Sequence, residues 1–293
     1  MNQLQQMIAQ FKLNVLTVDR VPESFSSIVY KITLMNHQIV YIKIPYSQVE
    51  LRREYVLLKY LYEELPVPQV LDYWEGDDRY FGGLLLSAVA GVPHTGAVDE
   101  PLAYEIGLYH AKLHKVTLDA PYLDAYVDNV FEKWTQFVRN QFYAYAQDVN
   151  KVIPLKLFEQ SLQYFERYQK RLPPPDGPCL IHMDYRLGNI LVDENRVKGI
   201  IDFESVLIGA TEMDFIKLEH DIFRKYIGVK DAYQQGYASI RPLIDLDQIL
   251  PFYAFTNAFN SIGWCVRRGI NKHQAYYQKN LADLKVIIQV DAF

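Results

Sequence analysis

The chain has 293 residues, half of them hydrophobic and 14% aromatic, so it can bury a large core in one or two domains. Its formal net charge of −5 disfavours nucleic acid as a partner, because phosphate backbones are bound by clustered Lys and Arg. The sequence has only two cysteines, which favours reduced, buried thiols in a cytoplasmic protein over a disulfide framework.

The sequence carries no signal for a membrane. Residues 1–12 lack a basic region followed by an apolar core, and the most apolar stretch, residues 82–92, is too short to span a bilayer. We therefore expect neither export nor a membrane anchor. Nothing in the sequence predicts an oligomeric state.

The first third of the chain is rich in strand patterns. Residues 14–21, 28–35 and 38–46 are typical of β-strands, and the last two flank a turn and should pair as a hairpin. A short polar loop without glycine, residues 22–27, joins the first two. Residues 69–91 contain two further strand-like runs that we expect to form a second hairpin.

A lysine and a glutamate in this region are predicted to pair. Lys43 lies inside a strand with apolar neighbours on both faces, so its charge needs a compensating group. The helix expected over residues 47–63 begins with a capping box and carries Glu54 on the same stripe as Leu51 and Leu58. Because this stripe faces the core, we predict an ion pair between Lys43 and Glu54.

The rest of the chain is mainly helical in pattern. Helices are expected over residues 102–115, 128–146, 154–171 and 251–269. The first of these carries His110 and His114 four residues apart on one face. No third ligand follows at a zinc-binding spacing, so we interpret the two histidines as packing and hydrogen-bonding residues.

Residues 179–202 form the most informative stretch. Three short apolar runs are separated by polar turns, which predicts three strands with polar residues at their ends. Asp184, Asn189 and Asp202 should then share one rim. Two carboxylates and a carboxamide supply the oxygen ligands that Mg²⁺ takes in proteins. Phosphoryl transfer uses the same set, with one Asp for the acceptor hydroxyl and an Asn and an Asp for metal.

Residues 182–189 match H-x-D-x-x-x-x-N, and an Asp-Phe pair follows at 202–203. This pattern resembles the protein-kinase-like small-molecule kinases, specifically the aminoglycoside phosphotransferase and choline kinase family. That family usually has Gly where Met183 stands. Glu204 replaces the Gly of the protein-kinase D-F-G, and a Glu there is common in the small-molecule branch. A protein kinase is further disfavoured because no A-P-E segment follows.

The resemblance implies an α+β, bilobal protein-kinase-like fold. Residues 1–90 would form an N-lobe with an antiparallel sheet and a helix that binds the nucleotide. Residues 91–293 would form a larger, mainly helical C-lobe with the catalytic loop, the metal site and the substrate pocket. The loop at 22–27 takes the place of the phosphate-covering loop, where the family often has Gly.

The resemblance also implies roles for individual residues on the catalytic side. Asp184 would orient the acceptor hydroxyl and accept its proton, and Arg186 would offset charge on the transferring phosphoryl group. Asn189 and Asp202 would hold Mg²⁺.

On the nucleotide side, Lys43 would bind the phosphates of ATP, with Glu54 fixing it. The backbone near Ser87 and Val89 would hydrogen-bond adenine.

The predicted function is an ATP- or GTP-dependent phosphotransferase that moves the γ-phosphate to a hydroxyl of a small molecule. An aminoglycoside-like antibiotic, an amino alcohol or a sugar are the candidate acceptors. Acids at Glu212, Glu219 and Asp221 favour a cationic or neutral acceptor. The alternative is a catalytically silent kinase-like protein that binds a nucleotide or a partner without transfer, which the glycine-free loop at 22–27 favours.

Overall fold

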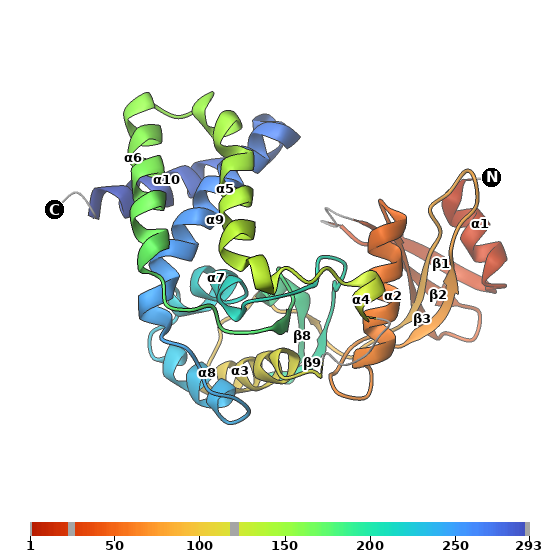
Figure 1. Ribbon diagram of the computed structural model, residues 1–293. Coiled ribbons are helices and arrows are strands. Elements are labelled where there is room, and N and C mark those ends of the chain that lie inside the picture. Colours follow the sequence, from red (N-terminus) through yellow and green to blue (C-terminus); the bar gives the residue numbers. More distant parts are fainter. Residues whose placement is uncertain (1, 23–26, 118–122, 291–293) are drawn as a thin grey trace. The chain divides into compact units, whose positions relative to one another are not determined.

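The structure is a computed structural model that describes residues 2–22, 27–117 and 123–290 (Figure 1). Its contacts group the chain into two compact units. Unit 1 comprises Met1–Asp128, Leu180–Leu207 and Asp221–Pro242, and unit 2 comprises Asn129–Cys179, Ile208–His220 and Leu243–Phe293. The lobe boundary near residue 90 stays a prediction. No helix of the described residues is long and apolar enough to cross a bilayer.

Unit 1 begins with a five-stranded antiparallel sheet. Its strands lie in the order β1 (Val15–Arg20), β2 (Ser27–Leu34), β3 (Ile39–Pro45), β5 (Gly83–Ser87) and β4 (Val70–Trp74). The register pairs Tyr30 with Ile42 and Lys43 with Leu84. Both predicted hairpins are therefore confirmed, and β3 lies in the middle of the sheet.

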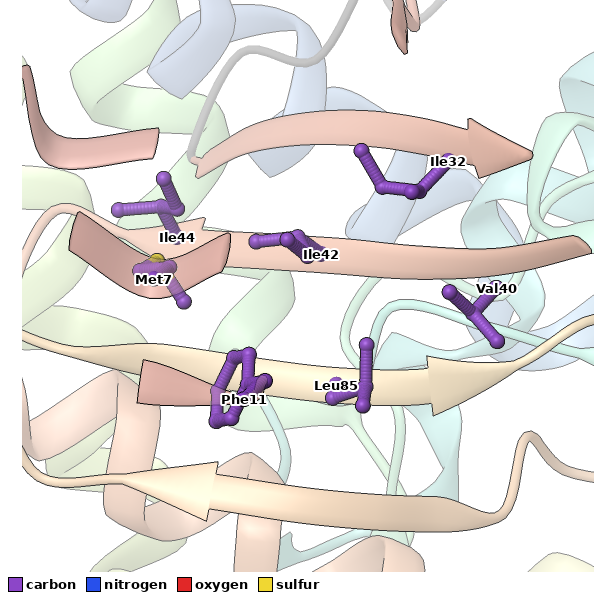
Figure 2. Packing of buried hydrophobic residues seen from close by; sticks show 7 residues of the cluster. All are labelled: Met7, Phe11, Ile32, Val40, Ile42, Ile44 and Leu85. Atoms are coloured by element: carbon purple, nitrogen blue, oxygen red, sulfur yellow. The ribbon is translucent and has the colours of Figure 1, made fainter. Parts of the chain in front are cut away.

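One face of this sheet is covered by an N-terminal helix, α1 (Gln3–Gln10), which the sequence analysis left unassigned. Met7 and Phe11 pack against apolar side chains of the sheet (Figure 2). The sheet contributes Ile32, Val40, Ile42, Ile44 and Leu85 to this cluster. Burying one such side chain is worth roughly 1.5–3 kcal/mol. Because side chains alternate along a strand, Lys43 of β3 points to the opposite face.

Helix α2 (Gln48–Leu61) follows β3. The Ser47 side chain accepts a hydrogen bond from the Glu50 backbone N–H at 3.2 Å, which caps the helix where the sequence predicted. Its buried residues are Leu51, Glu54, Leu57, Leu58 and Leu61. The predicted inward stripe is confirmed, and it places the Glu54 carboxylate in the interior of unit 1.

The remainder of unit 1 contains a small sheet and two closely packed helices. The sheet has the order β6 (Val92–Pro93), β8 (Ile190–Asp193) and β9 (Arg196–Ile200). The short strand β7 (Cys179–Ile181) precedes β8 in the chain. Helices α3 (Glu100–His114) and α8 (Val229–Ala238) meet at glycines. A Cβ at Gly107 would overlap the carbonyl of Tyr233, and one at Gly236 would overlap the carbonyl of Tyr104. The absence of a side chain at these two positions therefore lets the helix backbones approach each other closely.

Two histidine–tyrosine pairs lie between α3 and α8. His110 Nδ1 is hydrogen-bonded to the Tyr233 hydroxyl at 2.6 Å, and His114 Nδ1 to the Tyr237 hydroxyl at 2.7 Å. All four side chains are buried. The hydrogen bonds expected of the two histidines are therefore present.

Unit 2 is mainly helical. Its long helices are α5 (Trp134–Asn150), α6 (Leu155–Tyr168), α9 (Leu246–Arg268) and α10 (Gln274–Val290). Phe142 of α5 stacks on Phe165 at 4.0 Å and on Phe259 at 4.3 Å between ring centroids. The prediction that α9 begins at Pro251 was wrong. Asp245 caps the helix by accepting from two backbone N–H groups, and the proline is accommodated inside it.

Candidate active site

The segment between β7 and β8 forms a tight, hydrogen-bonded turn. The Asn189 N–H donates to the Arg186 carbonyl at 2.9 Å, within the short helix η3 (Leu187–Asn189). The His182 ring nitrogen Nε2 is hydrogen-bonded to the Ile201 carbonyl at 3.0 Å, and the Ile201 N–H donates to the Asn189 carbonyl. Met183 has φ 69°, in the left-handed region that favours glycine. This backbone position explains why a glycine suits this site of the motif.

Asp184 is held by the residues that the sequence placed beside it. Its Oδ2 accepts from Arg186 Nε at 2.8 Å and from Asn189 Nδ2 at 3.0 Å. Asn189 Nδ2 also donates to the Asp184 carbonyl at 3.0 Å. Burial opposes the charge of Arg186, but the Asp184 carboxylate outweighs it and raises the pKa of the guanidinium. The three side chains form one fixed group.

Lys43 is the centre of a second group. Its Nζ lies 2.7 Å from Glu54 Oε2, 2.6 Å from Asp202 Oδ1 and 3.2 Å from Glu204 Oε2. The predicted pair with Glu54 is present, and both side chains are buried. Burial disfavours the ammonium, yet the carboxylates of Asp202, Glu54 and Glu204 together hold the pKa of Lys43 well above its usual value.

The acids around Lys43 respond differently to the same surroundings. Burial raises the pKa of Glu54 to about 7, although Lys43 opposes the shift. Burial also acts to raise the pKa of Asp202, but there the attraction of Lys43 is stronger and the pKa is lowered. Asp202 therefore stays ionised. Its φ of 74° turns the chain sharply after β9.

Glu204 is a member of this group that sequence reasoning missed as a site residue. Its side chain is 3% exposed, and the only signal was its two-residue spacing from Asp202. The backbone around it is bound to α2. The Glu204 carbonyl accepts from Arg53 at 3.1 Å, and the Phe203 N–H donates to Glu54 at 3.3 Å.

The donor set fits a hard divalent cation. Four carboxylates, those of Glu54, Asp184, Asp202 and Glu204, stand beside two cationic side chains, Lys43 and Arg186. This excess of negative charge favours a divalent ion. Because the Asn189 nitrogen faces Asp184, its carboxamide oxygen could ligate such an ion, together with the Asp202 carboxylate.

Both groups line one cavity of about 650 Å³ within unit 1. Ser87 and Val89 line the same cavity, so it brings together all the predicted site residues. The Ser87 N–H already donates to the Gln69 carbonyl at 2.9 Å, so this group is not free for a nucleotide base. Val21, Pro22 and Ser27 reach the cavity from either side of residues 23–26, the part of the predicted phosphate loop that lies outside the described residues.

The wall beside Asp184 and Arg186 includes residues that the sequence did not single out. It is formed by His94, Thr95, Gly96, Asp221, Lys225 and Tyr226. Of the acids expected to face the acceptor, Asp221 lies in this wall. Glu212 does not act as a surface charge, because it is buried in unit 2, where its carboxylate accepts the Asp176 N–H at 3.1 Å. A larger hollow of about 900 Å³ near the ends of α2 and α3 contains none of the predicted residues.

A strand lysine held by a helix glutamate, next to an H-x-D-x-x-x-x-N turn and an Asp-Phe pair, is the arrangement of a kinase-like small-molecule phosphotransferase. The family model described as "Phosphotransferase enzyme family" matches residues 18–249. The chain therefore belongs to this family of enzymes, which act on hydroxyl groups of small molecules. No curated protein matches the sequence.

Solved structures share the fold over the whole chain. APH(2″)-IIia in complex with GDP and kanamycin has a TM-score of 0.78 and 18% identity, and covers 99% of each chain. Aminoglycoside 2′-phosphotransferase-IIIa in its GDP complex has a TM-score of 0.74 and 18% identity, over 99% of this chain and 100% of that one. A macrolide 2′-phosphotransferase type I has a TM-score of 0.72 and 17% identity, over 96% of this chain and 95% of that one. At these identities the likeness establishes the α+β kinase-like fold.

Proposed function

We propose that this enzyme uses Mg²⁺ to transfer the γ-phosphoryl group of ATP or GTP to a hydroxyl group of a small molecule. The observation that carries the proposal is the convergence of the Lys43 group and the Asp184 group on one cavity of unit 1. Each group supplies one half of the chemistry. The structures with similar folds that contain GDP support a nucleoside triphosphate as the donor.

On the donor side, Lys43 binds the phosphates, and Glu54 holds its ammonium in place. Asp202 and Asn189 are the metal ligands of this scheme. When bound, Mg²⁺ neutralises phosphate charge and orients the γ-phosphoryl group. Asp202 is bound to Lys43 through Oδ1 in the structure, so Oδ2 is the oxygen left for the metal.

On the acceptor side, Asp184 accepts the proton of the attacking hydroxyl. The hydroxyl oxygen forms a bond to the γ-phosphorus, the bond from that phosphorus to the β,γ-bridging oxygen breaks, and the nucleoside diphosphate leaves. Arg186 and Asn189 fix the Asp184 carboxylate through its Oδ2. Arg186 also places a positive charge beside the transferring phosphoryl group.

The acceptor class is a hydroxylated molecule that is cationic or neutral, such as an aminoglycoside-like antibiotic, an amino alcohol or a sugar. Asp221 lines the acceptor wall and forms no ion pair or hydrogen bond with the described residues, so it can receive an amino group. One similar structure contains kanamycin, and another is named as a macrolide phosphotransferase, which supports including both kinds of antibiotic among the candidates.

A screen of acceptors tests the proposal. The purified protein is incubated with Mg²⁺ and ATP or GTP against aminoglycosides, macrolides, amino alcohols and sugars, and release of nucleoside diphosphate is measured. We expect turnover with a cationic or neutral alcohol that is lost in EDTA. Tight nucleotide binding without turnover on any acceptor would instead support the catalytically silent alternative. Strong turnover on carboxylates or phosphates alone would contradict the acceptor class.

A further inference from the structure

Glu204 presents a buried charge that stability does not explain. Its side chain is 3% exposed, and its carboxylate accepts no hydrogen bond from the part of the chain that the structure describes. Among the described residues its one close cation is Lys43, whose Nζ is 3.2 Å away. A buried carboxylate costs free energy unless it is paired and hydrogen-bonded, so a neutral side chain of the same shape would be less costly here.

The ammonium of Lys43 has three N–H donors, and three carboxylates surround it. Glu54 and Asp202 each accept a hydrogen bond from it, and Glu204 Oε2 closes the third side at 3.2 Å without one. One carboxylate must therefore release the ammonium before it can bind a nucleotide. Asp202 is the carboxylate suited to leave, because its side chain is 27% exposed, against 2% for Glu54 and 3% for Glu204.

The two carboxylates that stay are held in place through the same helix. Glu54 belongs to α2 and also accepts the Phe203 N–H at 3.3 Å. Its neighbour Arg53 donates to the Glu204 carbonyl at 3.1 Å and pairs with Asp128 at 2.8 Å. The backbone at 203–204 is thus tied to α2 at two points, which fixes Glu204 relative to Glu54.

We propose that Glu204 is a positioning residue for Lys43: its charge and the hydrogen bond to Glu54 fix the ammonium from two sides, so that the donor given up by Asp202 points to the phosphates. With Glu54 alone, the ammonium could rotate about a single contact. This inference rests on the proposed function, because it gives Lys43 and Asp202 their roles in that reaction. It adds a residue that neither the motif nor the family membership assigns.

The test compares Glu204→Gln with the parent, using Mg²⁺ and ATP or GTP and the acceptor that turns over best in the screen. The rate of transfer at saturating substrates is expected to fall about tenfold, since a close pair contributes a coupling of this order. The dissociation constant for the Mg²⁺–nucleotide complex, measured by calorimetry, should change by less than about threefold. The melting temperature should stay the same or rise, because an unfavourable buried charge is removed.

Two further variants separate positioning from other effects. In a Lys43→Met background, Glu204→Gln should cause no additional loss of rate, because there is no ammonium left to orient. Glu212→Gln, which removes a buried carboxylate in unit 2, is the matched control and should keep the parent rate.

The outcomes distinguish the two proposals. If the parent turns over no acceptor, the proposed function fails and this inference with it. If the parent is active, three results would each overturn the role of Glu204 alone: an unchanged rate in Glu204→Gln, a loss that persists equally in the Lys43→Met background, or a loss that follows only from a lower melting temperature.

Discussion

Unit 1 contains two buried polar clusters of different composition. Between α3 and α8, each histidine is paired with one tyrosine hydroxyl, and His110 also stacks on Tyr185 at 4.0 Å. Around Lys43, one ammonium is shared by three carboxylates. In the first cluster the buried side chains have hydrogen-bond partners, as packing and stability require. The second keeps an excess of charge, which stability disfavours, so its composition indicates function.

The largest effect should come from removing Asp202, the proposed metal ligand in the group around Lys43. Asp202→Ala is expected to abolish Mg²⁺-dependent nucleotide binding and transfer together, because the metal loses its carboxylate ligand. Calorimetric titration with ATP or GTP, with and without Mg²⁺, measures the first effect. Binding that still depends on Mg²⁺ in this variant would show that the metal is held elsewhere.

Lys43→Met should have the next largest effect. The methionine keeps the length of the side chain but removes the charge that meets the phosphates. We expect the rate of transfer to fall by on the order of 10²–10³, the usual result of losing one preorganised electrostatic contact. Steady-state assays at saturating nucleotide measure it. A variant as fast as the parent would mean that the strand lysine does not serve the reaction.

A substitution in the histidine–tyrosine cluster should change the stability of the fold and leave nucleotide binding unchanged. Tyr237→Phe removes the hydroxyl that bonds His114 and also accepts from Arg241 at 2.9 Å. Leaving buried partners unsatisfied should lower the free energy of unfolding by about 1–3 kcal/mol, measured by urea denaturation. Nucleotide binding well below the melting temperature should be unchanged. A selective loss of binding in the folded variant would erase the contrast between the two clusters.

The parts of the site that were predictable from sequence depend on local periodicity. The alternation of β3 and the three- and four-residue spacing of α2 placed Lys43 and Glu54 on facing sides, and their ion pair is present. The spacing within 182–189 likewise anticipated that Asp184 and Asn189 are neighbours. These features are encoded over a few residues, so the sequence was sufficient to predict them.

Other features depend on contacts that are distant in the sequence. The burial of Glu204 follows from the left-handed turn at Asp202 and from contacts with α2, and no local pattern specifies either. Glu212 was expected at the surface, yet it binds the backbone of Asp176, 36 residues earlier. Helix α1 was different. Leu4, Met7, Ile8 and Phe11 have helical spacing, so that signal was present and simply not used.

The central claim is that the two groups of the cavity divide the reaction, with nucleotide and metal on one side and the acceptor hydroxyl on the other. Asp184→Asn tests this division most directly, because it keeps the size of the side chain and removes the base. Calorimetry should give a dissociation constant for the Mg²⁺–nucleotide complex within about threefold of the parent, while single-turnover transfer falls by roughly 10²–10⁴. Transfer at the parent rate, or loss of nucleotide binding in Asp184→Asn while Asp202→Ala retains it, would contradict the account.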